Sequence, residues 1–404
     1  MQLVGILAFV VALLLSVMIH EFGHFITARR FGMKVTEFFL GFGKKIWSTQ
    51  RGETEFGIKM IPAGGYCRIE GMSPGDDHSA GSRAFYRASG SRKLIVLGAG
   101  SFLHFVLGFV LLLVLFMAVG TTQLTSTIHE VSACVPSSVG SGACTASSQI
   151  SPAKQAGLQA GDHIISINGV RIKDWSKDVE IIRKSAGKPL VFGIIRGKVL
   201  KSTTSSTPDL EISITPTSRT INGKTYGFIG IMNEFAQVRS GPVSAVQKSV
   251  TTTGSFISAS VKSLISLPAK IPALWAQTVG GQKRDPEGLV GVVGVARVSG
   301  QAVASHALTV SERIATFIMI IASLNIFVGI FNLLPILPLD GGHMAVAIAD
   351  EIRAFYARLR GRGRPAAIDV AVLTPITMVV FVLLAGLTLL LLVADIVNPV
   401  TLNL

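Results

Sequence analysis

The sequence predicts a multi-pass α-helical membrane protein with a soluble α+β domain inserted between its membrane spans. Of its 404 residues, 49% are hydrophobic and only 15% are charged, a balance that is typical of membrane proteins. Four apolar segments reach the roughly 20 residues that a helix needs to cross a bilayer. They lie at about residues 3–28, 94–119, 314–337 and 375–397.

These spans divide the chain into four expected parts. Residues 1–119 form a first membrane half, in which a loop at about residues 34–72 joins the first two spans. Residues 127–217 form the soluble domain, and residues 227–311 form a segment outside the membrane or at its surface. Residues 312–404 form a second membrane half with the last two spans.

Basic residues predict how the spans are oriented. Lys and Arg gather in the loop between the first two spans and in the loop between the last two, and they are absent from both ends of the chain. The positive-inside rule therefore makes both loops cytoplasmic and places both termini and the soluble domain outside the cytoplasm. The net charge of +14 reflects this asymmetry and contact with anionic lipid headgroups, and it does not indicate nucleic-acid binding.

The first span carries the motif His20-Glu21-Phe22-Gly23-His24. In a helix, His20 and His24 lie one turn apart on one face, about 6 Å from each other, so both imidazoles can bind one zinc ion. Glu21 is turned by roughly 100° from His20, which keeps it out of the ligand set but within reach of a water beside the metal. Alternatively, the match arises by chance, or its polar residues mark the membrane interface.

The cysteines agree with the predicted topology. Cys134 and Cys144 fall in a Ser- and Gly-rich stretch of the exported region, where an oxidising compartment favours a disulfide between them. The alternative is that both remain unpaired. Cys67 lies in the predicted cytoplasmic loop, and we expect it to stay reduced.

The soluble domain resembles a bacterial PDZ domain. Residues 156–169 match its G-L-x-x-G-D-x-I-x-x-I-N-G core, with a strand at Ile165–Ile167 and an Asn-Gly turn. A helix at Trp175–Ala186 and strands near Leu190–Ile195 and Leu210–Ile214 are expected to follow. PDZ domains bind extended peptides or C-termini as an added strand. Alternatively, the domain is a steric module that binds no peptide.

The stretch between the soluble domain and the third span shows no chemical motif. Residues 246–267 have helical spacing, and Gly291–Val295 is expected to form a turn packed on the membrane. We interpret this region as a guide or clamp for substrate.

The third span ends in a segment that breaks the helix at the depth of the histidine motif. It reads Asn332-Leu-Leu-Pro-Ile-Leu-Pro-Leu-Asp340-Gly-Gly-His343. Irregular backbone at this depth is tolerated where it is buried or lines a cavity. Because catalytic zinc sites take three protein ligands, Asp340 is a candidate oxygen ligand. The alternatives are that Asp340 only caps a helix at His343–Leu359, or that His343 is a ligand.

Together these motifs resemble the site-2 protease family of intramembrane metalloproteases. His20–His24 and residues 332–341 carry the resemblance, which extends over nearly the whole chain. Residues 41–43 and 57–66 resemble the family's membrane-associated β-hairpin after the first span. The single PDZ insert and Asp395-Ile-Val-Asn-Pro399 look like the actinobacterial branch.

The resemblance implies a catalytic site with one Zn²⁺ ion. Its implied ligands are His20, His24 and Asp340, and Glu21 is implied as the catalytic acid and base. The implied location is the bacterial plasma membrane, with this site toward the cytoplasmic leaflet.

The resemblance also implies how substrate is held. Asn332 and Asn325 would hold an unwound substrate segment, and the Gly64-Gly65 stretch of the hairpin would pair with it as an added strand. The chain departs from the family at His104, where many members carry Asn in a Gly-Pro-x-x-Asn pattern. His104 either keeps a hydrogen-bonding role or is simply a buried polar residue.

The expected function is proteolysis within the membrane. The resemblance implies single-span substrates such as anti-sigma factors, first trimmed by another protease, as in regulated intramembrane proteolysis. Two other functions stay open: a non-proteolytic scaffold that uses its PDZ domain, and a membrane-bound zinc peptidase that cuts soluble chains.

Overall fold

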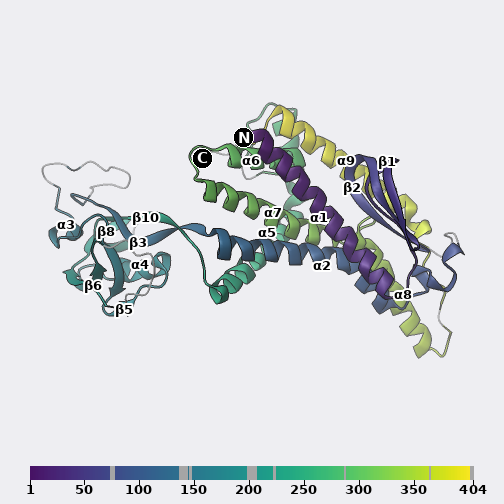
Figure 1. Ribbon diagram of the computed structural model, residues 1–404, viewed down its shortest axis with the longest axis horizontal. Helices are drawn as coiled ribbons and strands as arrows, with labels where there is room; N and C mark the ends of the chain where they lie inside the picture. Colours follow the sequence, from purple (N-terminus) through teal and green to yellow (C-terminus); the bar gives the residue numbers. More distant parts are fainter. Residues whose placement is uncertain are drawn as a thin grey trace. The chain divides into compact units, whose positions relative to one another are not determined.

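The computed structural model of the chain separates into two compact units, Met1–Gly120 with Arg239–Leu404, and Thr121–Val238 (Figure 1). Each unit is described by itself. The described residues are 1–72, 78–135, 144, 148–197, 207–221, 224–285, 288–363 and 365–400.

Four helices of the first unit are long and apolar enough to cross a membrane, as predicted, among the residues that the structure describes. They are α1 (Gln2–Arg30), α2 (Gly90–Val114, continued by a π-helical turn to Val119), α7 (Val310–Asn332) and α9 (Thr374–Val397). The third span begins four residues and ends five residues earlier than the sequence predicts. It ends at Asn332 because the proline-rich segment that follows cannot donate the backbone hydrogen bonds of a regular helix.

Small residues bring α2 close to its neighbours. A Cβ on Gly23 of α1 would lie 2.6 Å from the carbonyl oxygen of Ala99, and one on Gly108 would lie 2.8 Å from the Ile326 side chain. Such close backbone approach is the usual way in which membrane helices pack. It makes α2 the central helix, which packs against both α1 and α7.

The loop after α1 is a long antiparallel hairpin of β1 (Val35–Arg51) and β2 (Thr54–Ile69). Its base packs on α1, where the ring of Phe25 lies 5.3 Å from that of Phe38 and 5.4 Å from that of Phe56, between centroids. This aromatic contact fixes the hairpin against the helix that carries the histidine motif.

Three further α-helices belong to the first unit among the described residues. They are α5 (Pro242–Thr278), α6 (Val292–Ala304) and α8 (Asp340–Leu359). The prediction of a turn at Gly291–Val295 is wrong, because α6 begins at Val292. The Asp395 carboxylate of α9 accepts a hydrogen bond from the Gly294 N–H at 2.7 Å and so caps α6 from a distant part of the chain.

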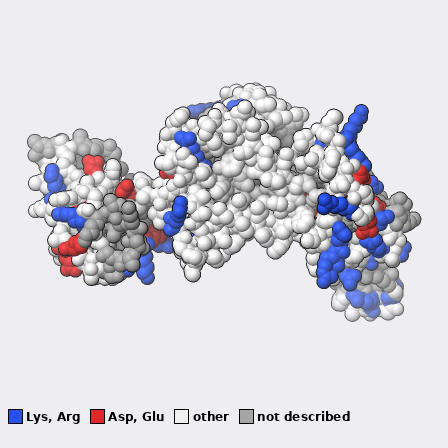
Figure 2. Space-filling model, viewed as in Figure 1, with Lys and Arg blue, Asp and Glu red and all other residues white. Residues whose placement is uncertain are grey.

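Charged side chains of this unit leave a broad uncharged band (Figure 2). In this view Lys and Arg gather most densely around the β1–β2 hairpin and α8, a few lie at the other end of the unit, and a broad middle part of the surface carries none. The apolar helices also carry large exposed hydrophobic side chains, among them Leu7, Leu15, Phe102 and Ile376, each more than half exposed. This distribution fits helices that face lipid.

The second unit is built on an antiparallel sheet. Its elements are β3 (Thr121–Val131), α3 (Pro152–Gln155), β4 (His163–Ile167), β5 (Val170–Arg171), α4 (Trp175–Lys184), β6 (Leu190–Ile195), β7 (Leu210–Ile214), β8 (Thr217–Ile221), β9 (Lys224–Phe228) and β10 (Ile231–Val238). The strand order in the sheet is β10-β3-β4-β6-β7, β5 pairs with β4, and β8 and β9 form a separate hairpin.

The strands predicted at residues 190–195 and 210–214 are confirmed, and the predicted helix ends two residues early, at Lys184. The expected turn is present, since Asn168 and Gly169 have φ values of 51° and 75°.

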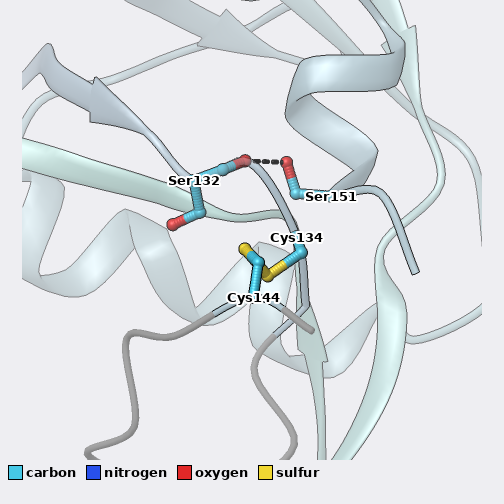
Figure 3. Close-up of a disulfide and its surroundings, with 4 residues drawn as sticks. All are labelled: Ser132, Cys134, Cys144 and Ser151. Carbon is cyan, nitrogen blue, oxygen red and sulfur yellow. Dashed lines mark hydrogen bonds between the residues drawn. A yellow bond between two sulfur atoms is a disulfide. The ribbon is translucent and has the colours of Figure 1, made fainter. Parts of the chain in front are cut away.

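A disulfide joins Cys134 and Cys144 in the second unit (Figure 3). Beside it, the Ser151 hydroxyl donates a hydrogen bond to the Ser132 carbonyl oxygen. Most of the chain between the two cysteines lies outside the described residues. The bridge ties the end of this stretch to the strand region after β3.

Candidate metal centre

The histidine motif lies on the buried side of α1. His20 and His24 are each only 7% exposed, and their Nε2 atoms are 3.1 Å apart. The helical spacing of four residues produces this pairing. Two imidazole nitrogens at this distance can both bind one cation through their lone pairs.

Asp340 completes the group from the start of α8. Its Oδ2 lies 3.2 Å from His20 Nε2 and 3.3 Å from His24 Nε2. The N-cap of α8 is Leu339, and Asp340 is the first residue inside the helix. The interpretation of Asp340 as a simple N-cap is therefore wrong. Its carboxylate faces the imidazoles instead.

Two glycines in the first turn of α8 let this helix begin close to the end of α7, which brings Asp340 to α1. A Cβ on Gly341 would lie 2.3 Å from the carbonyl oxygens of both Leu333 and Leu334, and one on Gly342 would lie 2.5 Å from the Leu337 nitrogen. Any larger residue would push the start of α8 away from the end of α7. The Gly-Gly pair of the motif thus fixes the position of the neighbouring carboxylate.

The three donor atoms fit a tetrahedral zinc ion. Bonds of 2.0–2.1 Å at tetrahedral angles separate neighbouring ligand atoms by about 3.3 Å, and the three atoms here are 3.1, 3.2 and 3.3 Å apart. Asp340 Oδ2 is buried and has no well-aligned hydrogen-bond donor among the described residues. A cation between these atoms would satisfy all three. The imidazole and carboxylate ligands are those that zinc takes in catalytic sites.

A backbone carbonyl sets the tautomer of His24. Its Nδ1 lies 2.8 Å from the Val96 carbonyl oxygen of α2. Since a carbonyl oxygen only accepts, Nδ1 must carry the proton, and Nε2 is left with the lone pair that a metal needs. The carbonyl of a membrane helix thus prepares this histidine for binding.

Gly100 of α2 faces both imidazoles directly. A Cβ at this position would lie 2.5 Å from His20 Cε1 and 2.5 Å from His24 Nε2. A glycine is therefore required for α2 to close this side of the site.

We expect Gly100→Ala to weaken metal binding. The added methyl must displace one or both imidazoles, and such overpacking costs about 1–3 kcal/mol, which corresponds to about 5- to 150-fold in affinity. Competition with a chelator on the purified protein measures the change. Gly98→Ala is the matched control on the same helix, because its Cβ would meet only Met344 Cε at 3.8 Å. Equal affinities for both variants would contradict this prediction.

Glu21 lies against the hairpin. The backbone N–H of Cys67 on β2 lies near its carboxylate, and a Cβ on Gly65 would lie 3.4 Å from Glu21 Cγ. Glu21 is not among the three clustered donors. Its carboxylate therefore lies beside the three donors, between α1 and β2.

The residues expected to hold substrate lie in different surroundings. Asn332 is the half-buried last residue of α7, and Gly64 and Gly65 lie on β2, with Gly65 turned toward Glu21. Asn325 is only 1% exposed, and its amide bonds to side chains and backbone inside the helices. The structure thus brings Gly65 to the site and holds Asn325 in the interior.

Sequence reasoning missed the parts of the site that the backbone provides. Nearly every residue type has a backbone carbonyl and a backbone N–H, so no sequence pattern marks the carbonyl of Val96 or the N–H of Cys67. Gly100 stands four residues before His104 in the second apolar span. A glycine one helical turn from a buried polar residue is the sequence feature that could have indicated close packing at this point.

Comparison with known proteins places the chain in a family. The pattern of Peptidase family M50 matches residues 8–377. The zinc metalloprotease Rip1 of Mycobacterium tuberculosis is 34% identical over 100% of this chain and 99% of its own. Rip1 of Mycolicibacterium smegmatis is 35% identical over 98% of each chain. The regulator of sigma-E protease RseP of Salmonella typhimurium is 24% identical over 86% of this chain and 90% of its own. The chain therefore belongs to peptidase family M50, the site-2 protease family of metalloproteases.

Proposed function

We propose that this protein is an intramembrane zinc metalloprotease that cleaves the transmembrane segments of single-span membrane proteins. The observation that carries the proposal is the triangle of His20, His24 and Asp340 donor atoms, built from the apolar helix α1 and the start of α8. Relatives named zinc metalloprotease support the choice of zinc, and three ligands match one ion.

Glu21 is the proposed acid and base of the reaction. When bound, zinc would polarise the scissile carbonyl and lower the pKa of a water at the site, so that this water can lose a proton and attack the carbonyl carbon. The Glu21 carboxylate, near the Cys67 N–H, would take the proton of this water and deliver it to the leaving amine. The buried imidazoles and the closely packed α2 keep other water away from the bond being cut.

A substrate helix must unwind before it can be cut, because its backbone groups are hydrogen-bonded to each other. We propose that the Gly64-Gly65 stretch of β2 pairs with the unwound segment as an added strand. Gly65 lies next to Glu21, which supports this role. Asn332, at the end of α7, is proposed to bind the same segment from the other side of the site.

Anti-sigma factors are the proposed substrate class, cut in regulated intramembrane proteolysis after another protease has trimmed them. A relative named regulator of sigma-E protease supports this class. We propose that residues 127–217 are a PDZ domain outside the cytoplasm, which excludes untrimmed substrates or binds a peptide or C-terminus. Its antiparallel sheet, the helix α4 and the Asn168-Gly169 turn support the assignment.

The proposed location is the bacterial plasma membrane, with both termini outside the cytoplasm and the metal site toward the cytoplasmic leaflet. The proposed parts are a first membrane half (1–119), an exported segment (227–311) and a second membrane half (312–404). The basic residues around the hairpin and α8 support this orientation, because such residues favour the cytoplasmic side.

Cleavage-site mapping tests the proposed function. We expect the full-length protein, reconstituted in liposomes with a trimmed single-span anti-sigma factor, to cut within the membrane segment. Mass spectrometry of the products identifies the bond. The Glu21→Gln protein is the control for a contaminating protease. Cuts confined to soluble loops would instead favour a membrane-bound peptidase of soluble chains.

A further inference from the structure

A buried polar chain runs from α2 to α7 and α1 beside the metal centre. It consists of His104, Asn325 and Ser16, which are 2%, 1% and 4% exposed. The His104 ring lies 5.0 Å from the His20 ring, between centroids. His104 is thus a third imidazole next to the two proposed ligands, although it is outside the three-residue donor cluster.

The hydrogen bonds of Asn325 fix the direction of its amide. Its Nδ2 donates to the Ile321 carbonyl oxygen at 2.8 Å and to Ser16 Oγ at 3.1 Å. The Ser16 hydroxyl in turn donates to the Ala12 carbonyl oxygen at 2.8 Å. Since the Ile321 carbonyl can only accept, the NH₂ group must point toward it, and Oδ1 must point the other way.

Asn325 therefore fixes the tautomer of His104. Its Oδ1 lies 2.8 Å from His104 Nδ1 and can only accept, so Nδ1 carries a proton. In a neutral imidazole the other nitrogen, Nε2, is then an acceptor with a free lone pair.

His20, in contrast, needs a hydrogen-bond acceptor for the proton on its second nitrogen. Its Nε2 faces Asp340 and His24, so binding a metal there leaves the proton on Nδ1. This Nδ1 is buried and has no hydrogen-bond partner among the described residues. Metal-binding histidines almost always donate this second N–H to an acceptor, as His24 does to Val96.

We infer that His104 is the positioning residue of His20: its Nε2 accepts the His20 Nδ1–H, directly or through one buried water. Asn325 holds His104 in the accepting tautomer, and Ser16 holds Asn325. This assigns Asn325 to the support of the metal site. The inference rests on the zinc site proposed above.

Zinc affinity of His104 variants tests this inference. Loss of such an outer partner typically weakens metal binding 10- to 100-fold. We expect this loss for His104→Leu, which removes the acceptor. His104→Gln should stay within about threefold of the native protein, because its amide can donate to Asn325 and accept from His20. Phe102→Leu, at a 63% exposed position of α2, is the control and should change nothing.

The readout is chelator competition on the purified full-length protein, together with the melting temperature with and without zinc. A purely structural role would lower the melting temperature of the zinc-free protein and leave the zinc affinity unchanged, which would overturn the inference. Equal zinc affinities for the Leu and Gln variants would also overturn it. If His104→Leu fails to fold, Asn325→Leu replaces it, and we expect a severalfold loss of affinity because the His104 tautomer is released. Native protein that binds no zinc would overturn the proposed function as well, which separates the two failures.

Discussion

The Glu21→Gln protein should bind zinc as tightly as the native protein and cleave its substrate about 100- to 10,000-fold more slowly. The amide has the shape of the carboxylate but cannot take a proton from water, and a positioned general base contributes rate factors of this size. Glu21 lies outside the donor triangle, so its replacement leaves the ligands in place. Initial cleavage rates and zinc content, measured on the same preparation, check both halves of this prediction.

A surface glutamate provides the control for Glu21. Glu180→Gln on α4 removes a carboxylate that pairs with Arg183 at the surface, and we expect full activity. Unchanged substrate processing by Glu21→Gln protein with its zinc intact would refute the protease and favour a scaffold.

Asp340→Ala should lose at least about 100-fold in zinc affinity and, with it, cleavage activity. Removing a residue that only supports a ligand costs 10- to 100-fold, so removing a ligand must cost at least the upper end of that range. The loss also leaves His20 and His24 with two nitrogens 3.1 Å apart and no carboxylate to balance a cation. Zinc content after dialysis against a weak chelator measures the effect.

The control for Asp340 is another helix-start aspartate. Asp369 accepts a hydrogen bond from the Ala371 N–H and caps a short turn, so Asp369→Ala should keep its zinc. If Asp340→Ala protein retains zinc as well as this control does, Asp340 is not a ligand.

The sequence predicted the membrane helices because length and hydropathy are local properties. It also predicted the three clustered donors, since the spacing of His20 and His24 and the broken segment before Asp340 are visible in the residue types. It failed at α6. Its Gly-Val start has weak helix propensity, and the cap comes from Asp395, about a hundred residues away.

Tertiary contacts also explain the features of the site that the sequence does not predict. Asn325 resembles a substrate-binding residue in the sequence, yet its partners are His104 and Ser16, on two other helices. The need for glycine at position 100 arises only where α2 meets the imidazoles of α1. Neither contact can be deduced from one stretch of chain.

Cys67 gives the native protein a built-in site for chemical labelling. It is the free cysteine of the chain, since the other two form the disulfide. Burial and the nearby Glu21 carboxylate raise the pKa of its thiol to about 12, and the thiolate is the reactive form. The thiol is therefore protected while β2 lies against α1. The rate at which a maleimide labels the unmodified protein thus measures how often β2 moves away from α1 and Glu21.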